Sequence, residues 1–377
     1  MKANTRREVI AGIGGSCVVA LLPRTVWSQA KPPKRIFIVQ SQEQGHPCGQ
    51  PQADGVLEGL AAYGWKVGEN LSVRHHYMDL YRTNTTADLL REDGAKALKE
   101  IEAFRPDVLF ALDDASIQFV MMPLVGRTEL PIVFSGMNAR PEVYNAQKKY
   151  MDSWKRPGGQ VTGVYERLYS AEALRVMTQA IPSLRGAKAV MITDMSVTGA
   201  AITKQFELEL KDVTDVRWEV RRVRDWAEYT ALIESLNDDP AVKAIYPIVM
   251  TASGPDGKTY TVGDVYDWTL AHSRKPEMAA NYFFARMGLF GGAVVNFGAM
   301  GRLAGQKGAQ ILAGAKPGDL PIEDAVDYAI VFNIKRARDL GIEIPAHVLA
   351  AAHAVYKDDL VPLKGKELVY DPRTRTF

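Results

Sequence analysis

The chain has 377 residues with 46 basic and 44 acidic side chains, so it is close to electrically neutral. The first thirty residues hold four of the basic residues and one acidic residue, and without them the net charge is near −1. This balance excludes the broad positive field that binding to nucleic acid or to an anionic membrane surface requires. Residues 31–377 exceed what one hydrophobic core usually fills, so two domains are expected. Only Cys48 remains beyond residue 30, so no intrachain disulfide can form.

Residues 1–30 have the pattern of an export signal. The arginine pair at 6–7 precedes a moderately apolar stretch over 9–22, which is shorter than the roughly 20 apolar residues that span a membrane. Residues 28–30 (SQA) provide a signal-peptidase site, so cleavage after Ala30 and a periplasmic location are expected. The arginine pair and the glycine-diluted apolar stretch resemble a twin-arginine (Tat) signal, with general (Sec) export as the alternative.

The first half of the chain alternates between strand and helix patterns. Residues 35–42 form a compact apolar run that ends in polar residues, which is typical of a buried parallel strand. The expected strands are 35–42, 71–78, 107–112 and 131–135, and the expected helices are 53–63, 86–104 and 116–125. Such alternation predicts a parallel sheet with helices on both faces.

The alternation breaks over the polar residues 144–159 and then resumes. The expected strands of this second unit are 161–165, 187–193, 216–223, 244–249 and 278–284, with helices at 199–211, 227–236 and 262–273. The later elements, 291–297, 303–312, 327–332, 335–340 and 346–356, are more than one lobe needs, so the chain should cross between lobes more than once. The sequence therefore predicts an α/β fold of two doubly wound parallel-sheet lobes joined by a multi-crossover hinge.

Polar and aromatic side chains follow the predicted strands in both units. Open parallel sheets bind ligands beyond the carboxyl ends of their strands, so these residues are the candidate ligand contacts. They are Ser41, Gln42, Asp113, Asp114, Ser116, Ser135, Gly136 and Asn138 in the first unit, and Asp194, Ser196, Tyr246, Asn281 and Phe283 in the second. Such a set suits a small polar or aromatic molecule. Each residue alone could equally serve as a cap or turn former, as Ser116 could for its helix.

Motifs of common enzyme sites are absent from the sequence. It contains no nucleophile elbow, no phosphate-binding loop and no dinucleotide fingerprint after a strand. Asp113 and Asp114 could act as acid and base, but neighbours at a strand end usually point apart, which favours one ligand contact and one helix cap. His75 and His76 would face opposite sides of their strand and so could not share a metal ion. We therefore expect no enzymatic activity, no cofactor and no metal.

Several motifs occur together in a recognisable order. These are residues 131–134 (PIVF), 156–164 (RPGGQVTGV), 170–184 (SAEALRVMTQAIPSL), 303–314 (LAGQKGAQILAG) and 331–345 (VFNIKRARDLGIEIP). With this spacing the chain resembles the ABC-transporter substrate-binding protein family that includes the tryptophan- and tyrosine-binding types. The resemblance spans nearly all of the chain after residue 30.

The resemblance implies a type I periplasmic binding protein, in which two lobes clamp a small molecule and then present a surface to a membrane permease. Residues 1–30 would be the signal peptide. Lobe 1 would comprise 31–160 with a return segment of about 292–325, and lobe 2 would comprise 161–291 with a C-terminal segment of about 326–377. The family's ligand contacts map onto residues 113–116, 135–138 and 194–196. A monomer is expected, with a small-molecule ligand and the permease as partners.

In one place the chain departs from the family pattern. Relatives usually read Tyr-Gly-Val-Asp before the late helix, where this chain has residues 296–299 (NFGA). An acid there would suit the amino group of a ligand, so its absence speaks against an amino-acid ligand. Two other functions stay open: a ligand-binding partner of a membrane sensor kinase or chemoreceptor and, with less support, an exported enzyme.

Overall fold

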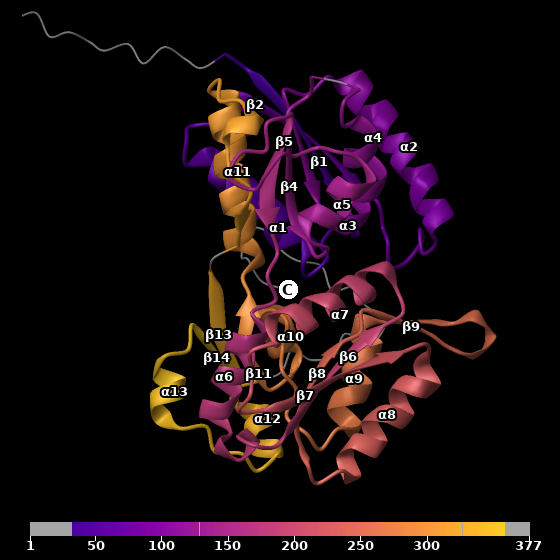
Figure 1. Ribbon diagram of the computed structural model, residues 1–377, viewed down its shortest axis with the longest axis vertical. Helices are drawn as coiled ribbons and strands as arrows, with labels where there is room; N and C mark the ends of the chain where they lie inside the picture. The colour runs from indigo at the N-terminus through magenta and orange to yellow at the C-terminus, as the bar shows by residue number, and fades with distance from the viewer. Residues whose placement is uncertain (1–31, 128, 326, 359–377) are drawn as a thin grey trace, which may run out of the picture. The chain divides into compact units, whose positions relative to one another are not determined.

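The computed structural model describes residues 32–127, 129–325 and 327–358. The expected export signal at residues 1–30 lies outside the described residues, as do residues 359–377 of the expected C-terminal segment. The described strands and helices form two lobes, each built around its own strands (Figure 1). None of the described helices combines the length and the apolar character that a membrane crossing requires.

Lobe 1 contains a parallel sheet of strand order β12-β5-β4-β3-β1-β2. Its strands are β1 (Lys34–Gln40), β2 (Leu71–Tyr77), β3 (Val108–Leu112), β4 (Ile132–Met137), β5 (Val161–Tyr165) and β12 (Glu323–Asp324). Its helices are α1 (Gly49–Ala61), α2 (Ala87–Phe104), α3 (Asp113–Ser116), α4 (Met122–Leu124), α5 (Pro141–Gln147) and α11 (Phe297–Leu312), with a π-helical stretch over Ile117–Met121.

Alternate residues of β1 enter two different cores. Ile36 and Ile38 pack in a cluster with α1 and α11, whereas Phe37 and Val39 pack in a cluster with α2, and all four side chains are fully buried. Successive side chains of a strand point to opposite faces of its sheet. Helices therefore cover both faces, which is why this strand is an unbroken apolar run in the sequence.

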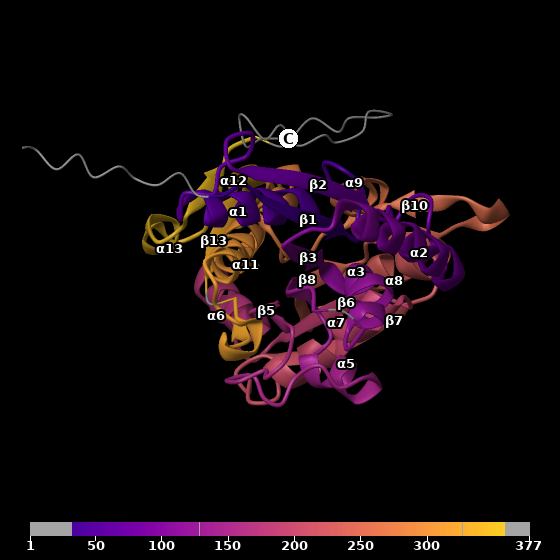
Figure 2. The same cartoon turned by 90° about the horizontal axis from the view of Figure 1, so that it is seen from above.

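Helix α11 comes from late in the chain and packs closely on α1 of lobe 1, with glycines at the contact. A Cβ on Gly301 would lie 1.9 Å from the backbone oxygen of Gln52, and a Cβ on Gly55 would lie 2.2 Å from that of Gly298. No side chain fits at either position, so the two helix backbones approach closely. The pair lies side by side in both views of the molecule (Figures 1 and 2).

Lobe 2 has three parallel strands in the order β7-β6-β8 and a second group in the order β11-β13-β14. Single bridges from Ile245 to Glu277 and from Met278 to Gly291 connect the two groups. The strands are β6 (Lys188–Asp194), β7 (Arg217–Val223), β8 (Val242–Ile248), β11 (Gly291–Val295), β13 (Tyr328–Asn333) and β14 (Ala354–Tyr356). The helices are α6 (Ser170–Ala180), α7 (Val197–Glu209), α8 (Trp226–Asp238), α9 (Val262–His272), α10 (Tyr282–Met287), α12 (Ile334–Asp339) and α13 (Ala346–Ala350).

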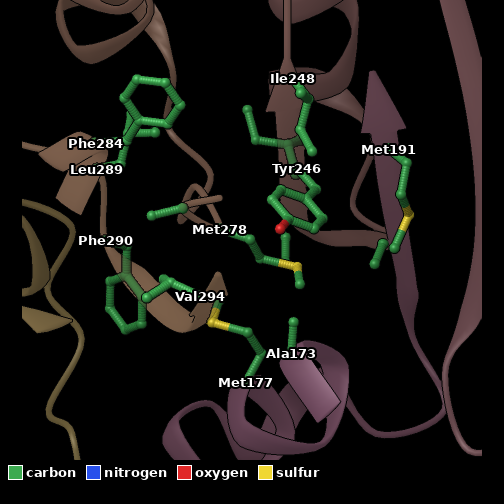
Figure 3. Close-up of a cluster of buried hydrophobic side chains, with 14 of the residues drawn as sticks. Ala173, Met177, Met191, Tyr246, Ile248, Met278, Phe284, Leu289, Phe290 and Val294 are labelled. Carbon is green, nitrogen blue, oxygen red and sulfur yellow. The ribbon is translucent and has the colours of Figure 1, made fainter. Parts of the chain in front are cut away.

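The core of lobe 2 joins its early and late segments. Met177 of α6 and Met191 of β6 pack with Met278, Phe290 and Val294, which come from the segments after α9 (Figure 3). Flexible methionine side chains fill irregular spaces between such elements. The hairpin of β9 (Thr251–Ser253) and β10 (Thr259–Thr261) extends from this lobe in both views (Figures 1 and 2).

The lobe boundaries differ from those expected by a few residues. β5 pairs with β4 from Val161 onward, so it belongs to lobe 1 and the first crossing follows Tyr165 rather than residue 160. β11 pairs with β13 in lobe 2, so the return segment begins at Phe297 with α11, later than residue 292. β12 then pairs with β5, and the chain crosses again before β13. A short strand can be recognised from its sequence, but its pairing partner cannot.

Two expected elements differ most from the structure. Residues 278–284 make only single bridges at Met278 and Asn281 in place of a strand, because the Asn281 side chain accepts the N–H of Phe284 at 3.0 Å and caps α10, which begins at Tyr282. The helix expected over 346–356 ends at Ala350, because the N–H of His353 donates to the Ile330 oxygen at 2.7 Å and the following residues join β13 as β14. In both cases a hydrogen bond overrides the apolar pattern.

Candidate functional site

A cavity of about 60 Å³ lies where the carboxyl ends of strands from both lobes meet. This is the position where open parallel sheets bind ligands. The wall from lobe 1 is polar and is formed by Gln42, His46, Asp113, Asp114, Asn138 and Glu166. The wall from lobe 2 is largely apolar and includes Ile202, Ile248, Met250, Ala280 and Phe284. The cavity therefore has an acidic, hydrogen-bonding side and an apolar side.

Asp113 begins α3 directly after β3 and is buried. Gln52 donates its Nε2–H to Asp113 Oδ1 at 3.3 Å. The contact depends on Gly136, which has a φ of 77° and where a Cβ would lie 2.2 Å from the same oxygen. Burial raises the pKa of Asp113 to about 7, against the hydrogen bonds of Gln42 and Gln52 and with the help of the Asp114 charge. The charge of Asp113 near neutral pH therefore depends on what else occupies the cavity.

Asp114 holds the loop after β4 in place. Its Oδ2 accepts the N–H of Asn138 at 3.1 Å, and its Oδ1 accepts the N–H of Ala139 at 3.3 Å and the hydroxyl of Tyr144 at 2.8 Å. Burial raises the pKa of Asp114, and these hydrogen bonds oppose the rise. Because its oxygens are already engaged, Asp114 is better suited to position Asn138 than to bind a ligand directly.

Glu166 follows β5 at the start of the first crossing and is only 3% exposed. Its Oε2 has no hydrogen-bond partner among the described residues, although the side chain lines the cavity. Burial raises its pKa well above the ordinary value, and the charges of Asp113, Asp114 and Glu209 add to the rise. A buried carboxyl oxygen without a donor is uncommon in proteins, so it points to a group that comes from outside the chain.

His46 faces the same cavity as a neutral ring. Its Nδ1 accepts the N–H of Cys48 at 3.2 Å, which assigns the ring proton to Nε2. Burial, with the nearby charge of Arg82, lowers the pKa of His46 to about 3. Its ring lies 5.6 Å from that of Tyr81, measured between centroids, and both residues line the cavity. His46 therefore offers one N–H donor and no charge.

Asn281 links the two lobes beside the cavity. Its Oδ1 caps α10, and its Nδ2 donates to the sulfur of Cys48 at 3.4 Å. Cys48 directly precedes α1 of lobe 1, and its side chain packs with the core of lobe 2. Burial above all raises the pKa of Cys48, and the charges of Asp113 and Glu166 contribute. The thiol is thus protonated at neutral pH and acts as a small packing group.

The structure brings together part of the set expected from strand ends. The expected residues that line the cavity are Gln42, Asp113, Asp114, Asn138 and Asn281. Gly136 lies behind Asp113, as described above. The remaining expected residues do not line the cavity, and most have partners of their own in the fold.

In lobe 1, Ser41 and Ser116 tie β1 to the turn after β3. The hydroxyl of Ser41 donates to the Leu112 oxygen at 2.8 Å and accepts the N–H of Ser116 at 2.9 Å. The Ser116 hydroxyl in turn donates to the same Leu112 oxygen at 2.7 Å. Ser135 is fully buried within β4, and its hydroxyl has no partner among the described residues. None of the three serines lines the cavity, and Ser41 and Ser116 stabilise the turn that carries Asp113.

In lobe 2, Asp194 and Ser196 form the start of α7. Asp194 accepts the N–H of Ser196 at 2.9 Å, and Ser196 accepts the N–H of Gly199 at 3.0 Å as the N-cap. Tyr246 lies among the buried side chains of the lobe core (Figure 3). Its ring packs against that of Phe206. Phe283 is buried in α10 outside the cavity lining, because the segment is a helix and its neighbour Phe284 faces the cavity instead.

Glu166 and Tyr81 line the cavity but are absent from the set expected from the sequence. Both follow strand ends, those of β5 and β2, so the rule that located Asp113 applies to them as well. Phe284 would have been found only with the correct assignment of α10. Among the described residues, no three His, Cys, Asp or Glu side chains are grouped in a way that could hold a metal ion.

Comparisons with known proteins agree with this architecture. The family model described as ABC transporter substrate binding protein matches residues 41–356. No curated protein matches the chain in sequence. A crystal structure titled as an ABC domain in complex with L-Trp from Streptococcus pneumonia has a TM-score of 0.66 at 20% identity, covering 86% of this chain and 99% of that one.

Two further solved structures share the fold. A conserved domain protein from Vibrio cholerae has a TM-score of 0.64 at 19% identity, with 85% of this chain and 99% of that chain covered. A ligand-free, open substrate-binding protein with adhesive properties from Clostridium difficile has a TM-score of 0.61 at 17% identity, with 86% and 100% covered. At these identities the likeness concerns the fold alone.

The two lobes of parallel strands, with a cavity between their strand ends, define a type I periplasmic binding protein-like fold. The chain belongs to the family of ABC transporter substrate-binding proteins, since the family model covers most of its length. Members of such a family bind a small molecule for an ABC transporter and are not enzymes.

Proposed function

We propose that the protein is the exported, periplasmic solute-binding component of an ABC import system and that it clamps a small polar or aromatic molecule between its lobes. The observation that carries the proposal is the cavity enclosed by strand ends of both lobes. Its volume of about 60 Å³ is small beside the roughly 300–1,000 Å³ of typical ligand sites. A ligand would therefore enter while the lobes are apart and be enclosed when they close.

The chemistry of the lining supports a ligand with both polar and apolar parts. Asn138 and Asn281 offer hydrogen-bonding groups from the two lobes, and Phe284 and Met250 offer apolar surface. The structure titled as a complex with L-Trp has the same fold. A fold of this kind can therefore enclose an aromatic ligand of about that size. We place the ligand contacts at Gln42, Asp113, Asn138, Glu166 and Asn281.

A ligand screen by thermal unfolding tests this function. A molecule present at 100 times its dissociation constant adds about 2.7 kcal/mol to the stability of the protein, so a library of small metabolites should contain a compound that raises Tm. The compound should be recovered unchanged, since no turnover is expected.

Two matched variants show whether the stabilising compound binds in the cavity. Ala280→Phe adds a ring to the cavity lining and should abolish the stabilisation, whereas Ala227→Phe adds the same ring to an exposed position of α8 and should not. A broad library without any stabilising compound, or a stabilisation that survives Ala280→Phe, would contradict the proposal.

The export route has its own test. We propose that residues 1–30 direct export through the twin-arginine pathway and are removed after Ala30. Replacing both arginines with lysine (Arg6→Lys and Arg7→Lys) should keep the uncleaved protein in the cytoplasm, because that pathway requires the arginine pair. Undiminished export of the double variant would indicate the general pathway, and a mature N-terminus other than Lys31 would correct the cleavage site.

A further inference from the structure

The acidic side chains that line the cavity have no basic counterpart in the described lining. Asp113 and Glu166 are both buried and face it from lobe 1, and Glu166 Oε2 has no partner among the described residues. No lysine or arginine belongs to the cavity lining in the described part of the chain. His46 cannot supply a positive charge, because burial lowers its pKa to about 3. The cavity thus contains buried acidic groups without a matching cation.

The side chains that line the cavity from lobe 2 indicate that the rest of the ligand is apolar. Phe284, Ile248 and Met250 line it from lobe 2, and the ring of Tyr81 lines the cavity from the loop after β2. Apolar side chains favour hydrocarbon, and aromatic rings additionally attract cations that lie within about 6 Å of the ring centre. The lining therefore suits a molecule with one charged end and one apolar end.

We propose that the cavity binds a small organic cation, an amine or amidine with an apolar or aromatic part, whose charged group lies between Glu166 and Asp113. This inference deepens the proposed function and rests on it. The N–H groups of such a cation would donate to both carboxylates in charge-assisted hydrogen bonds. Burying an ionised carboxylate without a partner costs free energy. Closure of the lobes around a cation avoids this cost, whereas closure around a neutral molecule does not. Gln42 Oε1, which also lacks a partner among the described residues, offers a further acceptor.

A carboxylate on the ligand would meet no cationic side chain in the described cavity lining. α7 and α11 begin beside it, and helix N-termini attract anions. However, Ser196 already accepts the N–H of Gly199 at 3.0 Å, and Asn296 already accepts the N–H of Ala299 at 3.0 Å. Each cap engages one N–H at its helix end, and with no basic side chain in the described lining a ligand carboxylate would have no cationic partner there, so the ligand should lack the carboxylate that an amino acid carries.

A metal ion is the other cation to consider. It would need several oxygen, nitrogen or sulfur ligands arranged around one point. The described residues contain no group of three His, Cys, Asp or Glu side chains that could hold a metal ion. The apolar wall of lobe 2 would also leave the coordination sphere of an ion unfilled. An organic cation can pair with the acidic side chains of lobe 1 and contact the apolar side chains of lobe 2, whereas a metal ion can only do the first.

Pairs of compounds that share a skeleton and differ in charge test the inference. We would compare tryptamine with indole-3-acetate, phenethylamine with phenylacetate, and benzamidine with benzoate in thermal unfolding at pH 7.5, with L-tryptophan as a zwitterion and calcium and zinc as metal controls. The expected result is that Tm rises only with the amines or amidine. If none of these skeletons fits, the stabilising compound from the wider metabolite library should be a cation.

A substitution at Glu166 tests the position of the charged group. Glu166→Gln keeps the shape of the side chain but cannot ionise beside the cation, so the affinity for the stabilising cation should fall about tenfold or more. The Tm of the ligand-free variant should stay the same or rise, because a buried acidic group is lost. Glu58→Gln is the control: Glu58 lies on α1 outside the cavity lining and accepts an N–H of Arg302 at 2.9 Å, so this variant should keep its affinity.

The outcomes separate the two proposals. Stabilisation by an acid, by L-tryptophan or by a metal ion without any effect of the amines would overturn the assignment of a cation and leave the binding function standing. The same holds if Glu166→Gln binds the cation as tightly as the unchanged protein does. No stabilising compound in either collection would contradict the binding function itself, and with it this inference.

Discussion

Asn281 donates its side-chain amide to the sulfur of Cys48 at 3.4 Å, which joins the first turn of α10 in lobe 2 to the residue before α1 in lobe 1. Both residues line the cavity and both are buried. Because they belong to different lobes, the contact exists only while the lobes are close together. Cys48 is also the one cysteine after residue 30, which makes it a natural reporter of lobe opening.

We expect Cys48 to react slowly with iodoacetamide at pH 7.5 in the ligand-free protein, and about tenfold more slowly still with a saturating stabilising compound. Burial keeps its thiol protonated, so only molecules with open lobes react. The measurement is the rate of mass increase of the protein, with the urea-unfolded chain as the reference for a fully accessible thiol. Labelling that proceeds at the unfolded rate in the liganded protein would mean that the lobes do not enclose Cys48.

We expect Asp113 to contribute to the change of the unfolding free energy with pH. Its pKa is raised from 3.8 to about 7 in the folded protein, so the folded state holds a proton that the unfolded state releases. The stability gained from this group is complete below about pH 4 and is lost as the pH rises through about 7. The buried groups that act on it or respond to its charge are Asp114, Glu166, Cys48 and Tyr81.

Asp113→Asn should therefore flatten the loss of stability between about pH 5 and pH 8, since the amide does not titrate. Asparagine tolerates the φ of 66° at this position better than most residues do. Urea unfolding midpoints at both pH values measure the effect. The same pH dependence in variant and unchanged protein would show that Asp113 is ionised throughout.

Gly136→Ala should destabilise the protein by about 1–3 kcal/mol and weaken ligand binding. The new methyl group would need a φ of 77° and would lie 2.2 Å from Asp113 Oδ1 and 2.8 Å from Gln52 Nε2. Gly126→Ala is the matched control, because its φ of 68° is similar and no atom lies within 4 Å of the added group. Denaturant unfolding and affinity for the stabilising compound are the readouts. If both substitutions have equal effects, position 136 requires glycine only for its backbone conformation and not for its contact with Asp113.

Arg336→Met should cost about 3–5 kcal/mol of stability, the usual effect of leaving a buried charge without its partner. The guanidinium of Arg336 donates to Glu277 Oε2 at 3.0 Å and to the Ser273 oxygen at 2.9 Å, and Glu277 is fully buried. The double variant with Glu277→Gln should recover part of the loss. Lys335→Met removes the neighbouring exposed ion pair with Asp339 and should cost below about 1 kcal/mol. Similar losses in both single variants, measured by urea unfolding, would contradict the role assigned to the buried pair.

Much of the fold follows from patterns within short stretches of sequence. The apolar run at residues 36–39 predicted β1, because a strand covered by helices on both faces has no polar side. The helix at α2 followed from its apolar face and from Thr86, whose hydroxyl accepts the N–H of Leu89 as the N-cap. The strand predicted at 278–284 was wrong, because the apolar residues of this segment suit a strand and a buried helix equally well.

The α/β class, the alternation of elements and the polar residues at strand ends follow from the sequence alone, because each depends on residues close together in the chain. Which of those side chains line one cavity depends on how the strands pair and the lobes meet. Glu166 joins Asp113 at the cavity, whereas Tyr246 points into the lobe 2 core, although all three occur at or near strand ends. The reason is physical: the direction of a side chain depends on strand pairing and on the point where the chain crosses, and both are contacts between residues distant in sequence.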